Sequence, residues 1–331
     1  MNDDIRKMES ELKSLPGVVE LVFYGKEDDP FSTKLGEFLQ ALSEASSGKV
    51  AVVEGTREAS LPARPAFTVK GKDGKDCHYL AQPEANEVAP FLKSLQFAAS
   101  GKAPLDNDVE ASVAGISSAA EIWVFVSPFC ANCPKVVETV LSFGANNSLL
   151  NTTIIDVQRF PKLAEGFSIK SVPAVVIDLD LVLIGQVSPK GLANLIEKRG
   201  EELYEVELLR SLMHRNLTAE AVDWVSKGRG QSALLTLFQE PELSTRMGAL
   251  VILEGVLEKN FQSVRNMVPA LIELLSHEDA RIRGDIADFL GGVGDSRVVP
   301  ALENLTNDPD PDVAEAAEDA LEEMRDSNGD E

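Results

Sequence analysis

The chain has 331 residues, of which 44% are hydrophobic and 26% charged, which is the composition of a soluble globular protein with two or three domains. Its 54 acidic residues against 31 basic ones give a net charge of −23, which disfavours nucleic acid and anionic membrane as partners. With three cysteines, no signal-peptide pattern and no apolar stretch that could span a membrane, we expect a cytoplasmic protein without a disulfide framework.

Residues 1–99 are predicted to form one α/β domain. Its expected elements, in chain order, are a helix over 3–14, a strand over 18–24, a helix over 30–45, a strand over 49–54, a strand after Pro65, a strand over 77–81 and a helix over 84–98.

Residues 107–200 repeat this order of elements. Their expected elements are a helix over 108–116, a strand over 121–126, a helix after Cys133, a strand over 152–157, a short helix from Phe160, a strand after Pro173, a strand over 181–184 and a helix over 190–198. The linker between the two blocks is short, so we expect their two sheets to pack together.

A proline begins a strand at the same place in both blocks. Ala63-Arg64-Pro65-Ala66 in the first block matches Ser171-Val172-Pro173-Ala174 in the second. A proline at a strand start loses no ladder hydrogen bond, so both sites suit a cis peptide bond, with a trans proline on an edge strand as the alternative.

Residues 203–326 contain helical patterns only, with a repeat of 31 residues. Val268-Pro269-Ala270-Leu271 recurs as Val299-Pro300-Ala301-Leu302. Helices at such a period predict stacked helix pairs, with a degenerate first pair over 210–239, a second helix of each pair that starts at the proline, and a single terminal helix over 312–324. Residues 327–331 are predicted to be an acidic tail.

Cys130 and Cys133 are the one pair of residues with an evident capacity for covalent chemistry. They lie in Pro128-Phe129-Cys130-Ala131-Asn132-Cys133-Pro134, between a predicted strand and a predicted helix. A helix N-terminus favours a thiolate, and a second cysteine one turn later can close a disulfide with the first. We interpret Cys130 as the attacking thiol and Cys133 as the resolving thiol.

This arrangement resembles the N-terminal domain of the bacterial alkyl hydroperoxide reductase flavoprotein and, more distantly, the protein disulfide oxidoreductases. The Arg64-Pro65 and Val172-Pro173 segments and the Cys130-Ala131-Asn132-Cys133-Pro134 motif carry the resemblance, which covers about residues 5–200. It implies two tandem thioredoxin folds, α/β in class, of which only the second has redox cysteines. The all-α remainder resembles a short solenoid of HEAT-type repeats, and no flavin fingerprint follows Gly200.

The resemblance also implies which residues surround the dithiol. Pro173 should face the cysteines, the Val172 backbone should pair with a bound peptide, and Phe129 should form an apolar rim, unless Phe129 packs in the core. Many thioredoxins place a buried acid where this chain has Val124. In the flavoprotein family a glutamate of the first fold approaches the dithiol instead, and Glu87 matches it; the alternative is a solvated glutamate in a first helical turn.

Two functions follow from these observations. The first is a protein disulfide oxidoreductase that uses no cofactor and no metal, acts on disulfide-bearing proteins, which the resemblance extends to a peroxidase, and exchanges electrons with an external thiol reductase. In this interpretation the helical repeats recruit a protein partner. The second is a redox-tuned adaptor in which the helical repeats are the functional binding surface. Cys77 is expected to be structural.

Overall fold

The computed structural model describes residues 3–56 and 61–329. The chain divides into two compact units, residues 1–199 and residues 200–331. No helix within the described ranges is both long enough and apolar enough to cross a membrane.

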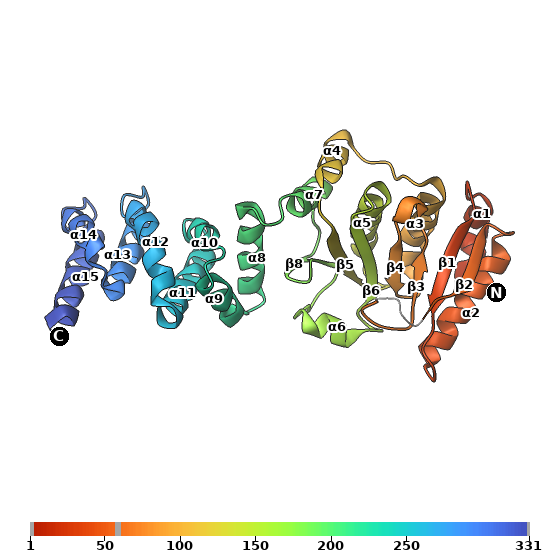
Figure 1. Cartoon of the computed structure of the whole chain (residues 1–331), viewed down its shortest axis with the longest axis horizontal. Coiled ribbons are helices and arrows are strands. Elements are labelled where there is room, and N and C mark those ends of the chain that lie inside the picture. The colour runs from red at the N-terminus through yellow and green to blue at the C-terminus, as the bar shows by residue number, and fades with distance from the viewer. Residues whose placement is uncertain (1–2, 57–60, 330–331) are drawn as a thin grey trace. The chain divides into compact units, whose positions relative to one another are not determined.

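The N-terminal unit alternates helices and strands (Figure 1). Its elements are α1 (Asp3–Lys13), β1 (Val19–Tyr24), α2 (Pro30–Ala45), β2 (Val50–Glu54), β3 (Ala66–Val69), η1 (Lys72–Gly74), β4 (Cys77–Leu80), η2 (Ala85–Glu87), α3 (Val88–Ser100), α4 (Asn107–Gly115), β5 (Ala120–Val126), α5 (Cys133–Asn146), β6 (Leu150–Asp156), α6 (Pro161–Gly166), β7 (Ala174–Ile177), β8 (Leu181–Ile184) and α7 (Pro189–Glu197).

The strands form one sheet of eight, in the order β2-β1-β3-β4-β6-β5-β7-β8. The sequence analysis expected two sheets packed together, and this was wrong. Instead β4 and β6 pair in parallel, from Cys77 opposite Thr152 to Leu80 opposite Ile155. Because an unpaired strand edge leaves its N–H and C=O groups without partners, two half-sheets gain more by joining along their edges. The two blocks therefore share one continuous backbone ladder.

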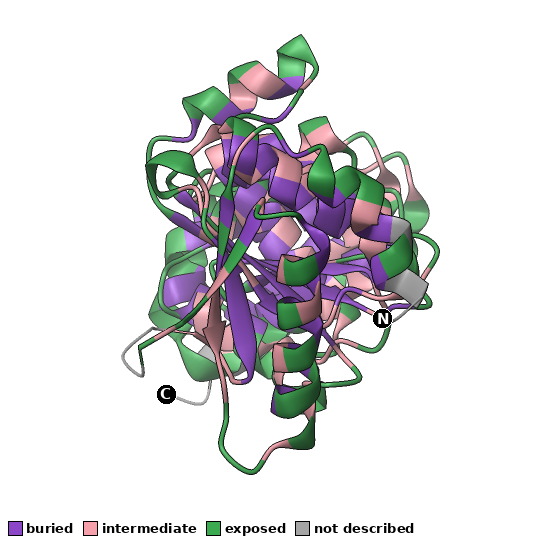
Figure 2. Ribbon diagram, turned by 90° about the vertical axis from the view of Figure 1, so that its right-hand side faces the viewer, coloured by how far each residue is buried: buried purple, intermediate pink, exposed green. Residues whose placement is uncertain are grey.

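The core is built against this joined sheet. Figure 2 shows the strands as buried ribbon at the centre of the N-terminal unit, with exposed surface mainly on the surrounding helices and loops. Helices α3 and α5 pack against each other, and Phe91 of α3 contacts Phe67 and Tyr79 with ring centroids 5.9 and 5.6 Å apart. The aromatic rings of the first block thus pack close to the strand pair that joins the blocks.

The peptide bonds Arg64–Pro65 and Val172–Pro173 are both cis, as predicted. Each proline immediately precedes a strand, β3 or β7, so no hydrogen bond of a strand ladder depends on its missing N–H. The two blocks therefore share this local backbone conformation as well as their order of elements.

The C-terminal unit is entirely helical. Its elements are α8 (Glu202–His214), α9 (Thr218–Ser226), α10 (Gln231–Phe238), α11 (Leu243–Lys259), α12 (Phe261–Leu274), α13 (Ala280–Val293), η3 (Ser296–Val298), α14 (Val299–Leu305) and α15 (Pro311–Gly329).

Two predicted helix boundaries in this unit were wrong. Helix α12 does not begin at Pro269, because the Asn260 side chain caps that helix nine residues earlier by accepting from the Ser263 N–H. The terminal helix α15 continues to Gly329, beyond the predicted end at residue 324. The predicted first pair over 210–239 corresponds to α9 and α10, after the end of α8. Residues 330–331 lie outside the described part, and the acidic tail over 327–331 stays a prediction.

We predict that Phe91→Ala destabilises the N-terminal unit by about 3–5 kcal/mol, because it empties a fully buried aromatic site. Urea unfolding can be followed by fluorescence in a Trp224→Phe background, where Trp123 is the remaining tryptophan. Val18→Ala, at a position that is 67% exposed, is the matched control and should change stability by less than about 0.5 kcal/mol. Equal effects of the two substitutions would contradict the packing described.

Candidate functional site

The two cysteines of the motif lie at the junction of β5 and α5. The Cys133 N–H donates to the Cys130 sulfur at 3.2 Å, and the Cys130 N–H donates to the Ser127 carbonyl at 3.0 Å. Cys133 is the first residue of α5, and Pro134 follows in the first turn, where its missing N–H costs nothing. The Cys130 sulfur thus accepts a backbone N–H that has no partner within the first turn of α5.

The two thiols differ in exposure. Both are free, but Cys130 is partly exposed whereas Cys133 is completely buried. Burial raises the pKa of the Cys133 thiol, and the neighbouring Cys130 and Glu87 raise it further. Cys130 is therefore the sulfur that a partner can reach, whereas burial keeps the Cys133 thiol protonated.

The loop before β7 closes one side of the dithiol. The Cys130 thiol donates to the Val172 carbonyl at 3.6 Å, which brings the cis Val172–Pro173 bond next to the reactive sulfur. Pro173 is buried and Val172 is partly buried. Phe129 is 76% exposed, so the alternative that it packs in the core is wrong. Phe129, Cys130 and Val172 therefore lie at the surface or near it, where a partner could reach them.

A turn of the first block contacts the cysteine loop. The Asn86 N–H donates to the Pro128 carbonyl at 3.1 Å, and the Asn86 side chain donates to the Cys130 carbonyl at 3.4 Å. Asn86 belongs to η2, directly before Glu87. The sequence analysis did not assign Asn86 a role, since nothing in a lone asparagine indicates a contact 44 residues away. The first block thus contacts, through Asn86, the loop of the second block that carries Cys130.

Glu87 is buried beside the dithiol. Its side chain is only 5% exposed, which rules out the alternative of a solvated glutamate, and its Oε1 has no hydrogen-bond partner within the described residues. Burial, together with the Asp156 carboxylate, raises the pKa of Glu87 to about 7. Glu87 can therefore accept or release a proton near neutral pH, and its charge acts on Cys133.

Asp156 is a second buried acid that the sequence analysis missed. It ends β6, is 2% exposed, and pairs in register with Val126, the last residue before the cysteine loop. Burial raises its pKa, and the backbone N–H of Gln158 and the nearby Arg159 oppose that shift. An aspartate at the end of an apolar strand could have been noticed, but only the parallel pairing of β5 with β6 brings it to this site.

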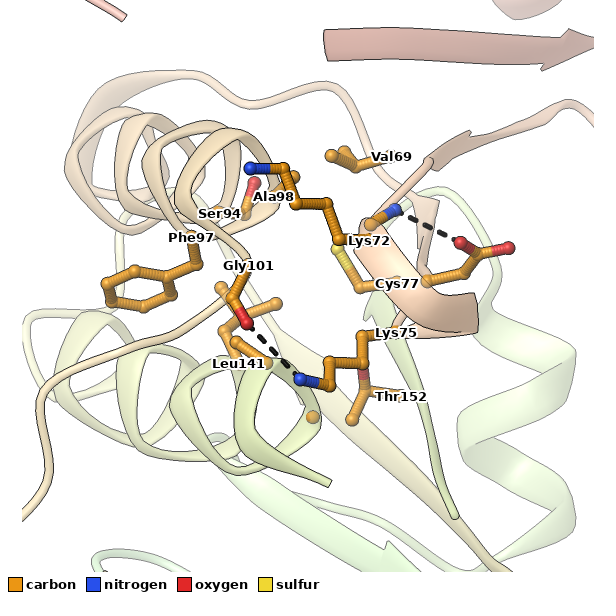
Figure 3. Close-up of a pocket in the computed structure, with 14 residues that line it drawn as sticks. Val69, Lys72, Lys75, Cys77, Ser94, Phe97, Ala98, Gly101, Leu141 and Thr152 are labelled. Carbon is orange, nitrogen blue, oxygen red and sulfur yellow. Dashed lines mark hydrogen bonds between the residues drawn. The ribbon is translucent and has the colours of Figure 1, made fainter. Parts of the chain in front are cut away.

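Cys77 lies apart from the dithiol. It is buried on β4, and burial raises the pKa of its thiol. Figure 3 shows Cys77 at a small cavity that is also lined by Ser94, Thr152 and Lys75. The cavity has a volume of about 20 Å³. The Lys75 ammonium donates to the Gly101 carbonyl. A buried neutral thiol is inert, so this geometry fits the structural role expected for Cys77.

Comparison with known proteins identifies the class of both units. Residues 120–197 match the thioredoxin domain and residues 231–322 match HEAT repeats, which confirms the predicted combination of an α/β thioredoxin-like region with an all-α repeat region. A thioredoxin from Methanocaldococcus jannaschii is 34% identical over 85 residues, which are 25% of this chain and 98% of the relative. Through this segment the chain belongs to the thioredoxin family.

Two solved structures resemble more of the N-terminal unit. The NTD_N/C domain of alkylhydroperoxide reductase AhpF from Enterococcus faecalis is 19% identical with a TM-score of 0.52, and the match covers 58% of this chain and 97% of that one. A protein disulfide oxidoreductase from Aeropyrum pernix is 15% identical with a TM-score of 0.53, covering 60% of this chain and 92% of that one. At these identities the likeness establishes the fold.

We predict that Glu87→Gln stabilises the protein relative to wild type as the pH rises from about 4.5 to 7. Because the pKa of Glu87 is raised to about 7 in the folded state, ionising it costs stability that the unfolded chain does not lose. The difference in free energy of unfolding between Glu87→Gln and wild type should be near zero at pH 4, reach on the order of 3 kcal/mol above pH 7, and then level off. Urea unfolding at pH 4, 6 and 8 measures it.

Glu37→Gln, at an exposed position of α2, is the control and should show no such pH dependence. If the free energies of unfolding of Glu87→Gln and wild type differed by a constant amount from pH 4 to pH 8, this would contradict the raised pKa of Glu87.

Proposed function

We propose that the protein is a thiol–disulfide oxidoreductase that uses Cys130 and Cys133 on protein disulfides. The observation that carries the proposal is the pairing of a partly exposed sulfur, which accepts the Cys133 N–H at 3.2 Å, with a buried second thiol one turn later. Membership in the thioredoxin family supports the same chemistry.

The exchange has two steps. The Cys130 thiolate attacks one sulfur of the substrate disulfide, forming a mixed disulfide and releasing the other substrate sulfur as a thiolate. The Cys133 thiolate then attacks the Cys130 sulfur, which closes the Cys130–Cys133 disulfide and releases the second substrate thiolate. The substrate gains two electrons, and the two protons that its thiolates take up balance those lost by Cys130 and Cys133.

Glu87 is proposed to take the proton of Cys133 in the second step. It is a buried carboxyl whose pKa of about 7 suits proton transfer near neutral pH, and its charge acts on Cys133. Asp156 is proposed as a positioning residue, because its own charge raises the pKa of Glu87. Phe129, Val172 and Pro173 are proposed to contact the polypeptide that carries the substrate disulfide.

The electrons must come from another protein. We propose an external thiol reductase as donor and a disulfide-bearing protein as acceptor, with a peroxidase as the acceptor that the flavoprotein resemblance favours. The helical unit would recruit one of these partners. In the alternative, the protein is an adaptor and the helical unit alone carries its function. Cys130→Ser/Cys133→Ser would then leave partner binding and phenotype intact.

We predict that Cys133→Ser accumulates mixed disulfides on Cys130, because the second step then has no attacking thiol. Cys130→Ser should form none, and wild type few. The measurement is non-reducing electrophoresis of cell extract followed by mass spectrometry of the adducts, together with reduction of insulin disulfides by wild type. Adducts that also form on Cys130→Ser, or wild type that leaves insulin oxidised in the presence of dithiothreitol, would argue against the proposal.

We also predict that Asp156→Asn moves the pH dependence of the second step to lower pH. Wild type should release substrate faster as the pH rises through about 7, where Glu87 loses its proton. Removing the Asp156 charge lowers the pKa of Glu87, so the rise should occur earlier, whereas Glu87→Gln should abolish it. Stopped-flow measurement of product release from pH 5 to 9 tests this, and an unmoved midpoint in Asp156→Asn would rule out the role given to Asp156.

A further inference from the structure

The helical unit has an open cavity across the first helices of three successive repeats. It is lined by the first turns of α11, by α13, and by the start of α15 with the residues just before it, and has a volume of about 380 Å³. Part of its wall is apolar, formed by Leu243, Met247 and Val313. Leu243 is 59% exposed, so the apolar surface continues to the rim. The dithiol mechanism makes no use of this cavity.

The cavity also carries an excess of negative charge. Asp285, Asp288, Asp310 and Asp312 line it, against Arg246 and Arg281. Both arginines are already engaged by acids of the same unit. Arg246 Nε lies 3.3 Å from the Asp285 carboxylate, and Arg281 forms two hydrogen bonds, of 3.0 and 2.6 Å, with the Asp279 carboxylate.

One of these aspartates, Asp288, has no internal explanation for its charge, whereas Asp312 lies in the first turn of α15, where the helix dipole stabilises an acid. Asp310 accepts from the Asp312 N–H at 3.1 Å and so satisfies the start of α15. The carboxylates of Asp288 and Asp312 form no ion pair within residues 3–56 and 61–329. Asp288 lies in the third turn of α13, beyond the first turn where a helix dipole stabilises acids.

Arg246, at the cavity wall, has buried hydrogen-bond donors without an acceptor in the part of the chain that the structure describes. It is only 2% exposed, and its Nε and Nη1 donate no hydrogen bond within the described residues. A buried guanidinium with unused donors costs stability unless an acceptor reaches it.

Gly284 leaves the middle of the cavity open. It lies inside α13, where glycine costs roughly 0.5–1 kcal/mol relative to alanine. Packing within the unit does not require it, because a Cβ at this position would come no nearer than 4.0 Å to any atom, the closest being Val313 Cγ2. A larger side chain there would project into the space that Met247, Val313 and Asp288 surround.

We propose that this cavity binds a lysine or arginine side chain from an extended basic segment of a partner protein. The aliphatic stem of such a side chain fits the walls formed by Leu243, Met247 and Val313, and its cationic head complements the unpaired carboxylates of Asp288 and Asp312. The partner that the helical unit selects is therefore basic at its contact site.

The test uses the full-length protein and a fluorescein-labelled decapeptide of glycine and alanine with three spaced arginines, measured by fluorescence anisotropy. We expect binding that weakens at least about tenfold when citrulline, which is neutral and nearly isosteric, replaces arginine. Asp288→Asn/Asp312→Asn and Gly284→Leu should each weaken binding by a similar factor. Circular dichroism verifies that each variant is folded. If Gly284→Leu does not fold, the isosteric variant Asp288→Asn/Asp312→Asn still tests the proposal.

Glu303→Gln on α14, outside the cavity, is the control for charge at a distance and should leave the affinity within about twofold of wild type. The proposal is overturned if wild type does not bind the arginine peptide at 1 mM, if citrulline binds equally, or if Glu303→Gln weakens binding as much as Asp288→Asn. Cys130→Ser/Cys133→Ser should bind the peptide like wild type, so this result stands apart from the success or failure of the redox proposal.

Discussion

The parallel pairing of β4 with β6 is the constraint on which the candidate site depends. It joins the two blocks into one sheet, with Leu80 opposite Ile155, one residue before Asp156. The turn that follows β4 then reaches the cysteine loop, where Asn86 binds the Pro128 and Cys130 carbonyls and Glu87 is buried beside Cys133. This pairing is therefore what brings Glu87, a carboxyl of the first block, to the cysteine loop of the second.

Local patterns in the sequence were sufficient for most elements and for the dithiol. Helical periodicity and the C-x-x-C spacing are encoded within a few residues, and the matching Pro65 and Pro173 segments predicted both cis bonds correctly. The joined sheet and the position of Asp156 depend on contacts between distant strands, which a single sequence does not specify. The Pro269 error arose because a side-chain cap at Asn260 decided where the helix begins.

The two units place their acidic residues in different environments. The N-terminal unit buries two acids, Glu87 and Asp156, and desolvation raises their pKa values. The helical unit instead leaves acids such as Asp288 unpaired at a cavity wall, where they can meet a cation from outside. The two proposals thus give acidic residues different roles, proton transfer in one unit and recognition of a cation in the other.

The most direct measurement is a redox titration of the purified protein in glutathione buffers, with the state of each cysteine read by alkylation and peptide mass spectrometry. The account predicts one two-electron transition that forms the Cys130–Cys133 disulfide, at a potential within roughly −120 to −270 mV, the span of thioredoxin-like proteins. Cys77 should stay reduced throughout. A Cys130 that carries glutathione while Cys133 remains a free thiol, or a pair that stays reduced in the most oxidising buffer, would contradict it.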